Sequence, residues 1–323
     1  MKTLILFLGL ASVSFGEVWL VTPEFLQWVS PNPEQDLQFK ADSSAVSIDS
    51  KSCQAWMKTE EGLHKVDFRG NSLLNVPFHI EGIILSHANP KGEFLTATAG
   101  QWRVQNSEGQ VVLEMPRPTN RALHVTPWQG DSAWYLTEGK ENELILGKIP
   151  ANGETQRFSI SKGVDLWGNV RVQADSVHKR VWIGYSATTS EHIYSPILEL
   201  RDWEGNLIFK KEISERALFF DSCLSEDGKL IFSRDLPTMP YTVPLYSYIE
   251  SLSADGTLER LYTASENQFL DSISCGTGNT VYALQRSIFG SDGQRIVKYE
   301  NHTETLIRPA DSKAREVYLC RNR

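Results

Sequence analysis

The feature that most constrains the fold of this chain is a short strand-like run, placed behind a polar turn, that recurs along its whole length. Three such units align without gaps at 49–56, 175–182 and 311–318, and each begins with Asp-Ser and ends in Trp or Tyr. Weaker copies occur between them. The seven bulky residues that mark the units recur 36 to 50 residues apart, and they are Trp56, Leu95, Trp134, Trp182, Phe232, Tyr282 and Tyr318.

Turn-forming pairs separate many of the other apolar runs. Glu-Gly, Asn-Gly or Asp-Gly pairs occur at 108–109, 152–153, 204–205, 255–256 and 292–293. Such pairs between short apolar runs are typical of β-hairpins. No segment of ten or more residues carries a sustained 3.6-residue stripe, so the sequence predicts an all-β chain.

Regular units of this size, with room for four strands in each full interval, predict a β-propeller. We expect a single domain of seven blades, with six blades plus extra edge strands as the alternative. The C-terminal segment should supply the inner strands of one blade, and the N-terminal segment, including 17–22 and 37–40, its outer strands. The recurrent aromatic residues are expected to pack between blades.

One unit resembles a known repeat. Residues 225–234 read Ser-Glu-Asp-Gly-Lys-Leu-Ile-Phe-Ser-Arg, which is similar to the S-x-D-G-K-x-I-x-F-x-S signature of the WD40-like repeats in propellers of the TolB and prolyl-oligopeptidase types. Glu226 stands where that signature has Pro. The resemblance covers one blade well and the others in outline, and it implies a blade and its turn without implying a partner or an activity.

The first sixteen residues have the layout of a signal peptide, with Lys2, an apolar core of about ten residues and small residues around Gly16. We therefore expect a leader at 1–16, a propeller domain at 17–323, and a secreted or periplasmic protein without membrane insertion. The net charge of −8 disfavours nucleic acid as a partner. No pattern in the sequence predicts an oligomeric state.

The four cysteines, Cys53, Cys223, Cys275 and Cys320, lack the paired CxxC spacing of a zinc site. An oxidising compartment would allow up to two disulfides, and buried free thiols are the alternative. Our hypothesis pairs Cys53 with Cys320 at the closure, and Cys223 with Cys275 at inner-strand ends of neighbouring blades.

The surplus length of the longer units predicts where a ligand binds, because function on a rigid scaffold is usually carried by loops. The surplus falls at 162–169, 187–195, 234–246 and 286–294, which the strand order places on one face of the ring. These segments mix aromatic, Met and Arg residues as interfaces do. The candidate binding residues are Trp167, His192, Tyr194, Arg234, Asp235, Tyr241 and Arg286.

The favoured interpretation is thus an exported binding or scaffold propeller for a protein, peptide or glycan, without a cofactor, since no motif such as CxxCH is present. The alternative is a metal-dependent, lactonase-like hydrolase with its site in the central channel. No G-x-S-x-G elbow supports serine hydrolysis. Oxygen and imidazole ligands for a metal would come from inner-strand ends, and the candidates are Asp49, His87, His124, Asp175, Asp221, Asp271 and Asp311. Ordinary turn chemistry explains the aspartates better than metal binding does.

Overall fold

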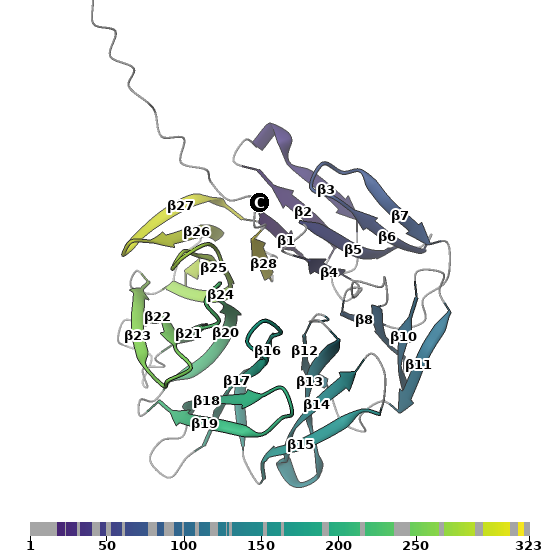
Figure 1. Cartoon of the computed structure of the whole chain (residues 1–323). Helices are drawn as coiled ribbons and strands as arrows, with labels where there is room; N and C mark the ends of the chain where they lie inside the picture. Colours follow the sequence, from purple (N-terminus) through teal and green to yellow (C-terminus); the bar gives the residue numbers. More distant parts are fainter. Residues whose placement is uncertain are drawn as a thin grey trace, which may run out of the picture.

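The computed structural model of the chain is a closed ring of seven four-stranded antiparallel sheets (Figure 1). It describes residues 18–22, 24–30, 33–40, 46–49, 53–59, 62–76, 83–86, 94–98, 100–106, 110–116, 122–126, 128, 131–150, 154–162, 165–188, 194–213, 217–235, 246–264, 268–287, 293–310 and 316–319. The seven-bladed β-propeller predicted from the sequence is confirmed, and the six-bladed alternative is excluded.

We number the blades along the chain and give the strands from the axis outward. Blade 1 contains β28 (Glu316–Leu319), β1 (Val18–Val21), β2 (Phe25–Val29) and β3 (Leu37–Lys40). Blade 2 contains β4 (Val46–Asp49), β5 (Gln54–Thr59), β6 (Gly62–Val66) and β7 (Ser72–Val76). Blade 3 contains β8 (Ile83–Ser86), β9 (Phe94–Ala97), β10 (Gln101–Gln105) and β11 (Val111–Pro116).

Blade 4 contains β12 (Ala122–Val125), β13 (Ser132–Glu138), β14 (Leu144–Pro150) and β15 (Gln156–Ser161). Blade 5 contains β16 (Leu166–Asp175), β17 (Arg180–Ala187), β18 (Ser195–Asp202) and β19 (Leu207–Glu212). Blade 6 contains β20 (Leu218–Leu224), β21 (Leu230–Asp235), β22 (Ser247–Leu252) and β23 (Leu258–Thr263). Blade 7 contains β24 (Gln268–Cys275), β25 (Val281–Ser287), β26 (Gln294–Glu300) and β27 (Thr303–Pro309).

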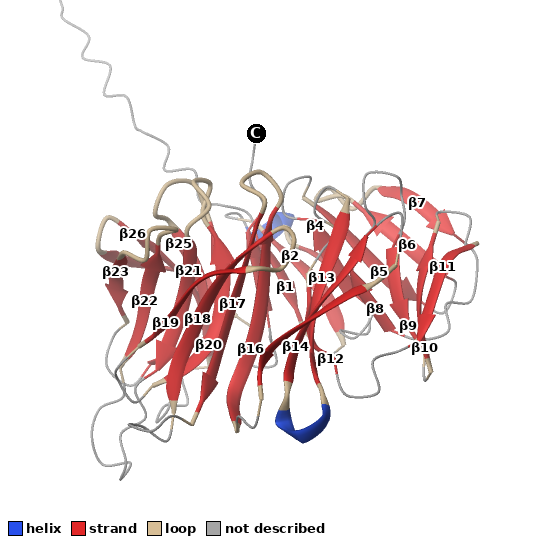
Figure 2. Cartoon of the chain, turned by 60° about the horizontal axis from the view of Figure 1, so that its bottom comes forward, coloured by secondary structure: helices blue, strands red, loops and turns tan. Residues whose placement is uncertain are grey.

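The helical content of the described residues is two 3-10 turns, η1 (Pro33–Gln35) and η3 (Lys140–Asn142), and the side view shows strands nearly everywhere else (Figure 2). Within the same residues no helix is long and apolar enough to cross a membrane.

The ring closes where the two ends of the chain meet in blade 1. β1 pairs antiparallel with β28, with Trp19 opposite Tyr318. We predicted that the C-terminal segment would supply more than one inner strand, which is wrong for the described residues, and Tyr318, which aligns in sequence with Trp56 and Trp182, lies in the innermost strand rather than the second one. β27 is already needed to complete blade 7, so the C-terminal end contributes the innermost strand alone, and Trp19 on β1 takes the second-strand position.

The recurrent bulky residues whose side chains the structure describes are buried, as predicted, and the side chain of Tyr318 lies outside the described residues. Trp182 of blade 5 is fully buried in one cluster with Phe219 and Phe232 of blade 6. Trp134 of blade 4 packs in the same way among the inner strands of blade 5. Apolar side chains buried between neighbouring sheets therefore stabilise the ring, with large aromatic residues at blades 4 to 6 and mostly aliphatic residues between blades 7 and 1.

The turn that carries the WD40-like signature shows why its residue types are needed. Ser225 Oγ accepts the backbone N–H of Lys229 at 2.9 Å, and the Gly228 N–H donates to the Ser225 carbonyl at 3.2 Å. Gly228 has φ +77°, and a Cβ there would meet the Asp175 carboxylate of blade 5 at 2.5 Å. Glycine is thus required twice, by the left-handed backbone and by the close approach of the neighbouring blade.

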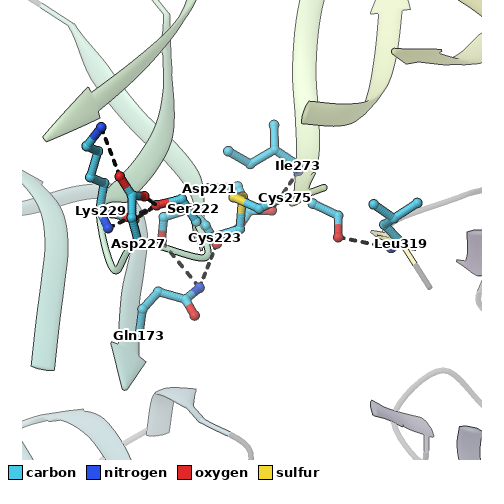
Figure 3. Close-up of a disulfide and its surroundings, with 11 residues drawn as sticks. Gln173, Asp221, Ser222, Cys223, Asp227, Lys229, Ile273, Cys275 and Leu319 are labelled. Atoms are coloured by element: carbon cyan, nitrogen blue, oxygen red, sulfur yellow. Dashed lines mark hydrogen bonds and ion pairs between the residues drawn. A yellow bond between two sulfur atoms is a disulfide. The ribbon is translucent and has the colours of Figure 1, made fainter. Parts of the chain in front are cut away.

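Polar groups also join the inner strands of neighbouring blades. Gln173 Nε2 of blade 5 donates to the Ser222 carbonyl of blade 6 at 2.6 Å, and Asp221 Oδ2 accepts the Ile273 N–H of blade 7 at 3.0 Å. The Leu319 N–H of blade 1 donates to Ser274 Oγ at 2.9 Å (Figure 3). These bonds join blades 5, 6, 7 and 1 in sequence around the ring.

The predicted disulfide between blades 6 and 7 is confirmed. Cys223 at the end of β20 is bonded to Cys275 at the end of β24, with 5.6 Å between their Cα atoms (Figure 3). Cys53 is also disulfide-bonded, and the pairing with Cys320 that we predicted for it lies outside the described residues. A disulfide of this kind is typical of an oxidising, extracellular environment.

Candidate ligand-binding site

Strand pairing in blade 5 locates the edge at which the enlarged connections leave the ring. Leu166, the first residue of β16, pairs with Ala187, the last residue of β17, and Ala187 pairs with Ser195, the first residue of β18. The connections before β16 and between β17 and β18 therefore start from one edge of the blade. Because β16 begins at Leu166, the predicted loop at 162–169 is shorter than expected, and Trp167 is a strand residue paired with Ser186.

The corresponding edges of blades 6 and 7 carry the other two enlarged connections. Asp235 at the end of β21 pairs with Ser247 at the start of β22, across the connection 236–246. Arg286 near the end of β25 pairs with Gln294 at the start of β26, across the connection 288–293. We call these strand ends of blades 5, 6 and 7 the loop face.

The seven predicted binding residues have different positions in the structure. Tyr194 lies half-buried just before β18. The side chain of Trp167 and the whole of His192 and Tyr241 lie outside the described residues. Arg234, which we expected in a surface loop, lies in β21 and is 1% exposed.

Arg234 is placed inside because β21 continues through Asp235. Its guanidinium donates to the Glu250 carboxylate through Nε at 2.7 Å and a terminal nitrogen at 3.0 Å. The Glu250 carboxylate also accepts Arg260 Nε at 3.2 Å. This two-point ion pair holds β21 against β22, so Arg234 belongs to the interior of blade 6 rather than to a contact surface.

The structure does bring Asp235 and Arg286 together, with four residues that we did not predict as binding residues. We call this group the Asp235 cluster, and its members are Asp235, Ser247, Gln268, Asp271, Arg286 and Gln294. Ser247 Oγ donates to Asp235 Oδ1 and lies 2.8 Å from the Gln268 carbonyl oxygen. Nothing in the sequence marks Ser247, Gln268 or Gln294 as a binding residue, because their contacts join different blades or opposite strands.

Asp271 connects the other half of the cluster. Its Oδ1 accepts a terminal nitrogen of Arg286 at 3.0 Å, and its Oδ2 accepts Gln294 Nε2 at 3.1 Å. The Arg286 side chain is 55% exposed and its guanidinium lies 5.8 Å from the centre of the Phe269 ring. Arg286 is therefore a charged group at the solvent side of the cluster, while Asp271 is largely enclosed.

Asp235 is the electrostatically unusual member. Burial raises the pKa of Asp235 from 3.8 to about 7, the nearby Asp271 carboxylate adds to the rise, and Ser247 and Arg286 oppose it. Its Oδ2 is buried and has no hydrogen-bond partner among the residues that the structure describes. A carboxyl group with a strongly perturbed pKa at a strand end is a candidate functional residue on physical grounds.

The metal ligands considered for the central channel do not assemble into one site among the described residues. Asp175 accepts the backbone N–H groups of Val177 and His178 at 3.1 Å, which is ordinary turn chemistry, and also bonds the His178 ring. Asp221 accepts Arg171 Nε at 2.8 Å.

The remaining candidate ligands are scattered around the ring. Asp49 lies at the end of β4, and His124 Nδ1 accepts the Val172 N–H at 3.2 Å. His87 and Asp311 lie outside the described residues. Within the described part of the chain, no group of three or more His, Cys, Asp or Glu side chains could hold a metal ion.

Comparison with known proteins gives similarity at the level of the fold. No protein-family model and no curated protein matches the chain. A solved streptogramin B lyase is similar over 94% of this chain and 91% of its own, with a TM-score of 0.51 and 14% identity. A catalytically inactive virginiamycin B lyase from Staphylococcus aureus, solved with quinupristin, is similar over 91% of this chain and 87% of its own, with a TM-score of 0.54 and 12% identity.

At these identities the likeness shows a shared fold, and the activities belong to those proteins. The chain is a seven-bladed β-propeller of the same architecture.

Proposed function

We propose that this chain is an exported binding propeller that engages a protein, peptide or glycan through the loop face of blades 6 and 7. The observation that carries the proposal is the Asp235 cluster. It places a buried carboxyl group, with one oxygen unpartnered among the residues that the structure describes, near an exposed guanidinium, on the strand ends from which two enlarged connections leave.

The arrangement has the physical properties of a recognition site. Its members lie at the ends of rigid strands of blades 6 and 7, and the Cys223–Cys275 disulfide links the inner strands of the same two blades. A preorganised site loses little conformational entropy on binding. The disulfide also suits an oxidising compartment, and the leader predicted at 1–16 would direct the chain to one.

Peptide and glycan arrays probed with the folded protein test this function. We expect binding to at least one class of probe, and Arg286→Glu should weaken that binding by about tenfold or more because it removes the exposed guanidinium donors of the cluster. Arg103→Glu is the matched control, since Arg103 also forms a surface ion pair, with Glu114 on blade 3, and should leave binding unchanged.

Equal binding by wild type and both variants would place the contact elsewhere and refute the proposal. The metal-dependent hydrolase that the sequence left as an alternative would instead show stabilisation by Ca²⁺ or Zn²⁺ in a thermal-shift assay and its loss with a chelator, because a ligand of the native state raises apparent stability.

A further inference from the structure

The Asp235 cluster contains more hydrogen-bond acceptors than donors. Asp235 Oδ2, Gln268 Oε1 and Gln294 Oε1 are buried oxygens without a hydrogen-bond partner in the part of the chain that the structure describes. Asp235 is 2% exposed and Gln294 is 7% exposed. Buried polar atoms are nearly always satisfied in folded proteins, so three unsatisfied acceptors in one cluster need an explanation.

Shared partners connect the three residues that carry these oxygens. Ser247 Oγ contacts both the Asp235 carboxylate and the Gln268 carbonyl oxygen. Asp271 holds Gln294 by a hydrogen bond and lies close enough to Asp235 to raise its pKa. The three side chains project from the ends of β21, β24 and β26, which border the seam between blades 6 and 7.

The charge of the cluster sets the sign of its ligand. Two carboxyl groups, Asp235 and Asp271, face a single guanidinium, Arg286, and Arg286 is already bonded to Asp271. Among the described residues Asp235 forms no ion pair of its own, and a buried carboxylate without such a pair is strongly unfavourable. An anion would worsen this imbalance, whereas a cation would correct it. The net charge of −8 of the whole chain favours the approach of a cation.

The number of free acceptors selects among cations. A primary ammonium group has three N–H donors and one positive charge, which matches three acceptor oxygens and one unpaired carboxylate. Hard metal cations such as Ca²⁺ take six to eight oxygen ligands, more than the cluster leaves free. A guanidinium is planar with five donors, two more than the free acceptors.

We propose that the Asp235 cluster binds a primary ammonium group carried by a protein or peptide, as a lysine side chain or a chain N-terminus. This inference rests on the proposed binding function and names its ligand. Arg286 indicates a peptide source, because its guanidinium stands at the rim with donors left over for a carbonyl or carboxylate group near the ammonium.

Isothermal titration calorimetry with acetyl-Gly-Lys-Gly-amide tests the proposal, with the norleucine peptide as the uncharged control of equal shape. We expect saturable binding of the lysine peptide and at least tenfold weaker binding of the norleucine peptide. Proton release at pH 7 should accompany binding, seen as different heats in phosphate and Tris buffers, because the ammonium displaces the proton of Asp235.

Two variants locate the site. Asp235→Asn and Gln268→Met should each weaken the lysine peptide by about tenfold, through loss of the charge in one and of an acceptor in the other. Asp255→Asn is the matched control: Asp255 caps the turn before Thr257 at the opposite end of blade 6, and its replacement should have no effect. Normal folding of the Gln268→Met variant keeps the test decisive if Asp235→Asn fails to fold.

Further titrations distinguish a peptide ligand from a free amine and from a metal ion. Equal affinity for n-butylamine would overturn the peptide source, and tighter binding of CaCl₂ than of the lysine peptide would overturn the ammonium site. If the lysine peptide does not bind while array binding remains sensitive to Arg286→Glu, the ligand class is wrong and the binding function stands. If the lysine peptide does not bind and array binding is insensitive to Arg286→Glu, the ammonium site and the proposed binding function are both refuted.

Discussion

Replacing Asp235 with Asn should remove a pH dependence from the stability of the propeller. The folded protein holds a proton on Asp235 up to about pH 7, because burial raises the pKa of this carboxyl group, whereas the unfolded chain releases it near pH 3.8. The folded state therefore binds more protons in this window, and the contribution of Asp235 to stability falls as pH rises through it. Asparagine keeps an acceptor for Ser247 and does not titrate.

The size of the change in the free energy of unfolding depends on the pH range that the experiment covers. Between pH 5 and pH 7 the free energy of unfolding should change by about 1.4 kcal/mol per pH unit from this one group. The Asp235→Asn variant should therefore gain about 3 kcal/mol relative to wild type between pH 5 and pH 8. Urea unfolding of both proteins at the two pH values measures this double difference, in which the titration of other groups cancels.

The control for this experiment is Asp255→Asn. Hydrogen bonds from Thr257 lower the pKa of Asp255, so this residue stays ionised from pH 5 to pH 8 and its replacement should leave the pH profile unchanged. Parallel profiles for wild type and Asp235→Asn would refute the claim that burial raises the pKa of Asp235.

Three further substitutions test other parts of the structure by urea unfolding. Burial, with a smaller effect from the Arg171 charge, lowers the pKa of His124 from 6.5 to about 3. The free energy of unfolding of the wild type should therefore fall by about 2 kcal/mol as pH falls from 6.5 to 5, and that of His124→Gln should fall less. A Cβ at Gly147 would overlap the Tyr135 ring, so Gly147→Ala should cost about 1 to 3 kcal/mol, while Gly100→Ala, with open space around it, should be neutral. Trp182→Ala should cost about 3 to 5 kcal/mol by leaving a cavity between blades 5 and 6, and a cost below about 1 kcal/mol would contradict the packing role of Trp182.

The sequence predicts the ring well because the signals that define blades are local. A turn such as 225–229 needs Ser, Gly and a following strand at fixed spacing, and Trp182 recurs because every blade must cover its neighbour. Cys223 and Cys275 could be paired because each ends an inner strand, and equivalent positions of neighbouring blades lie close together. The closure was less predictable, because Tyr318 has the same local pattern as a second-strand residue and only the strand count assigns it to β28.

The candidate site could be predicted only in part, because its contacts join residues far apart in the chain. Length variation correctly indicated the strand ends that carry Asp235 and Arg286. It could not show that Arg234, one residue earlier, points into blade 6 to pair with Glu250. Gln294 ends the predicted surplus segment 286–294 and carries no sequence signal of its own. Only the structure shows that Asp271 holds its amide nitrogen while its Oε1 has no hydrogen-bond partner among the described residues.

The most direct test of the account is the pKa of Asp235 itself, measured by ¹³C NMR of selectively labelled aspartate carboxyl groups with and without acetyl-Gly-Lys-Gly-amide. We predict a pKa of about 7 for the free protein and a fall of at least one unit on saturation, because a bound ammonium stabilises the carboxylate. An ordinary pKa near 3.8 in the free protein, or a raised value that the lysine peptide leaves unchanged, would contradict the claim that the Asp235 cluster is a site for a cationic ligand.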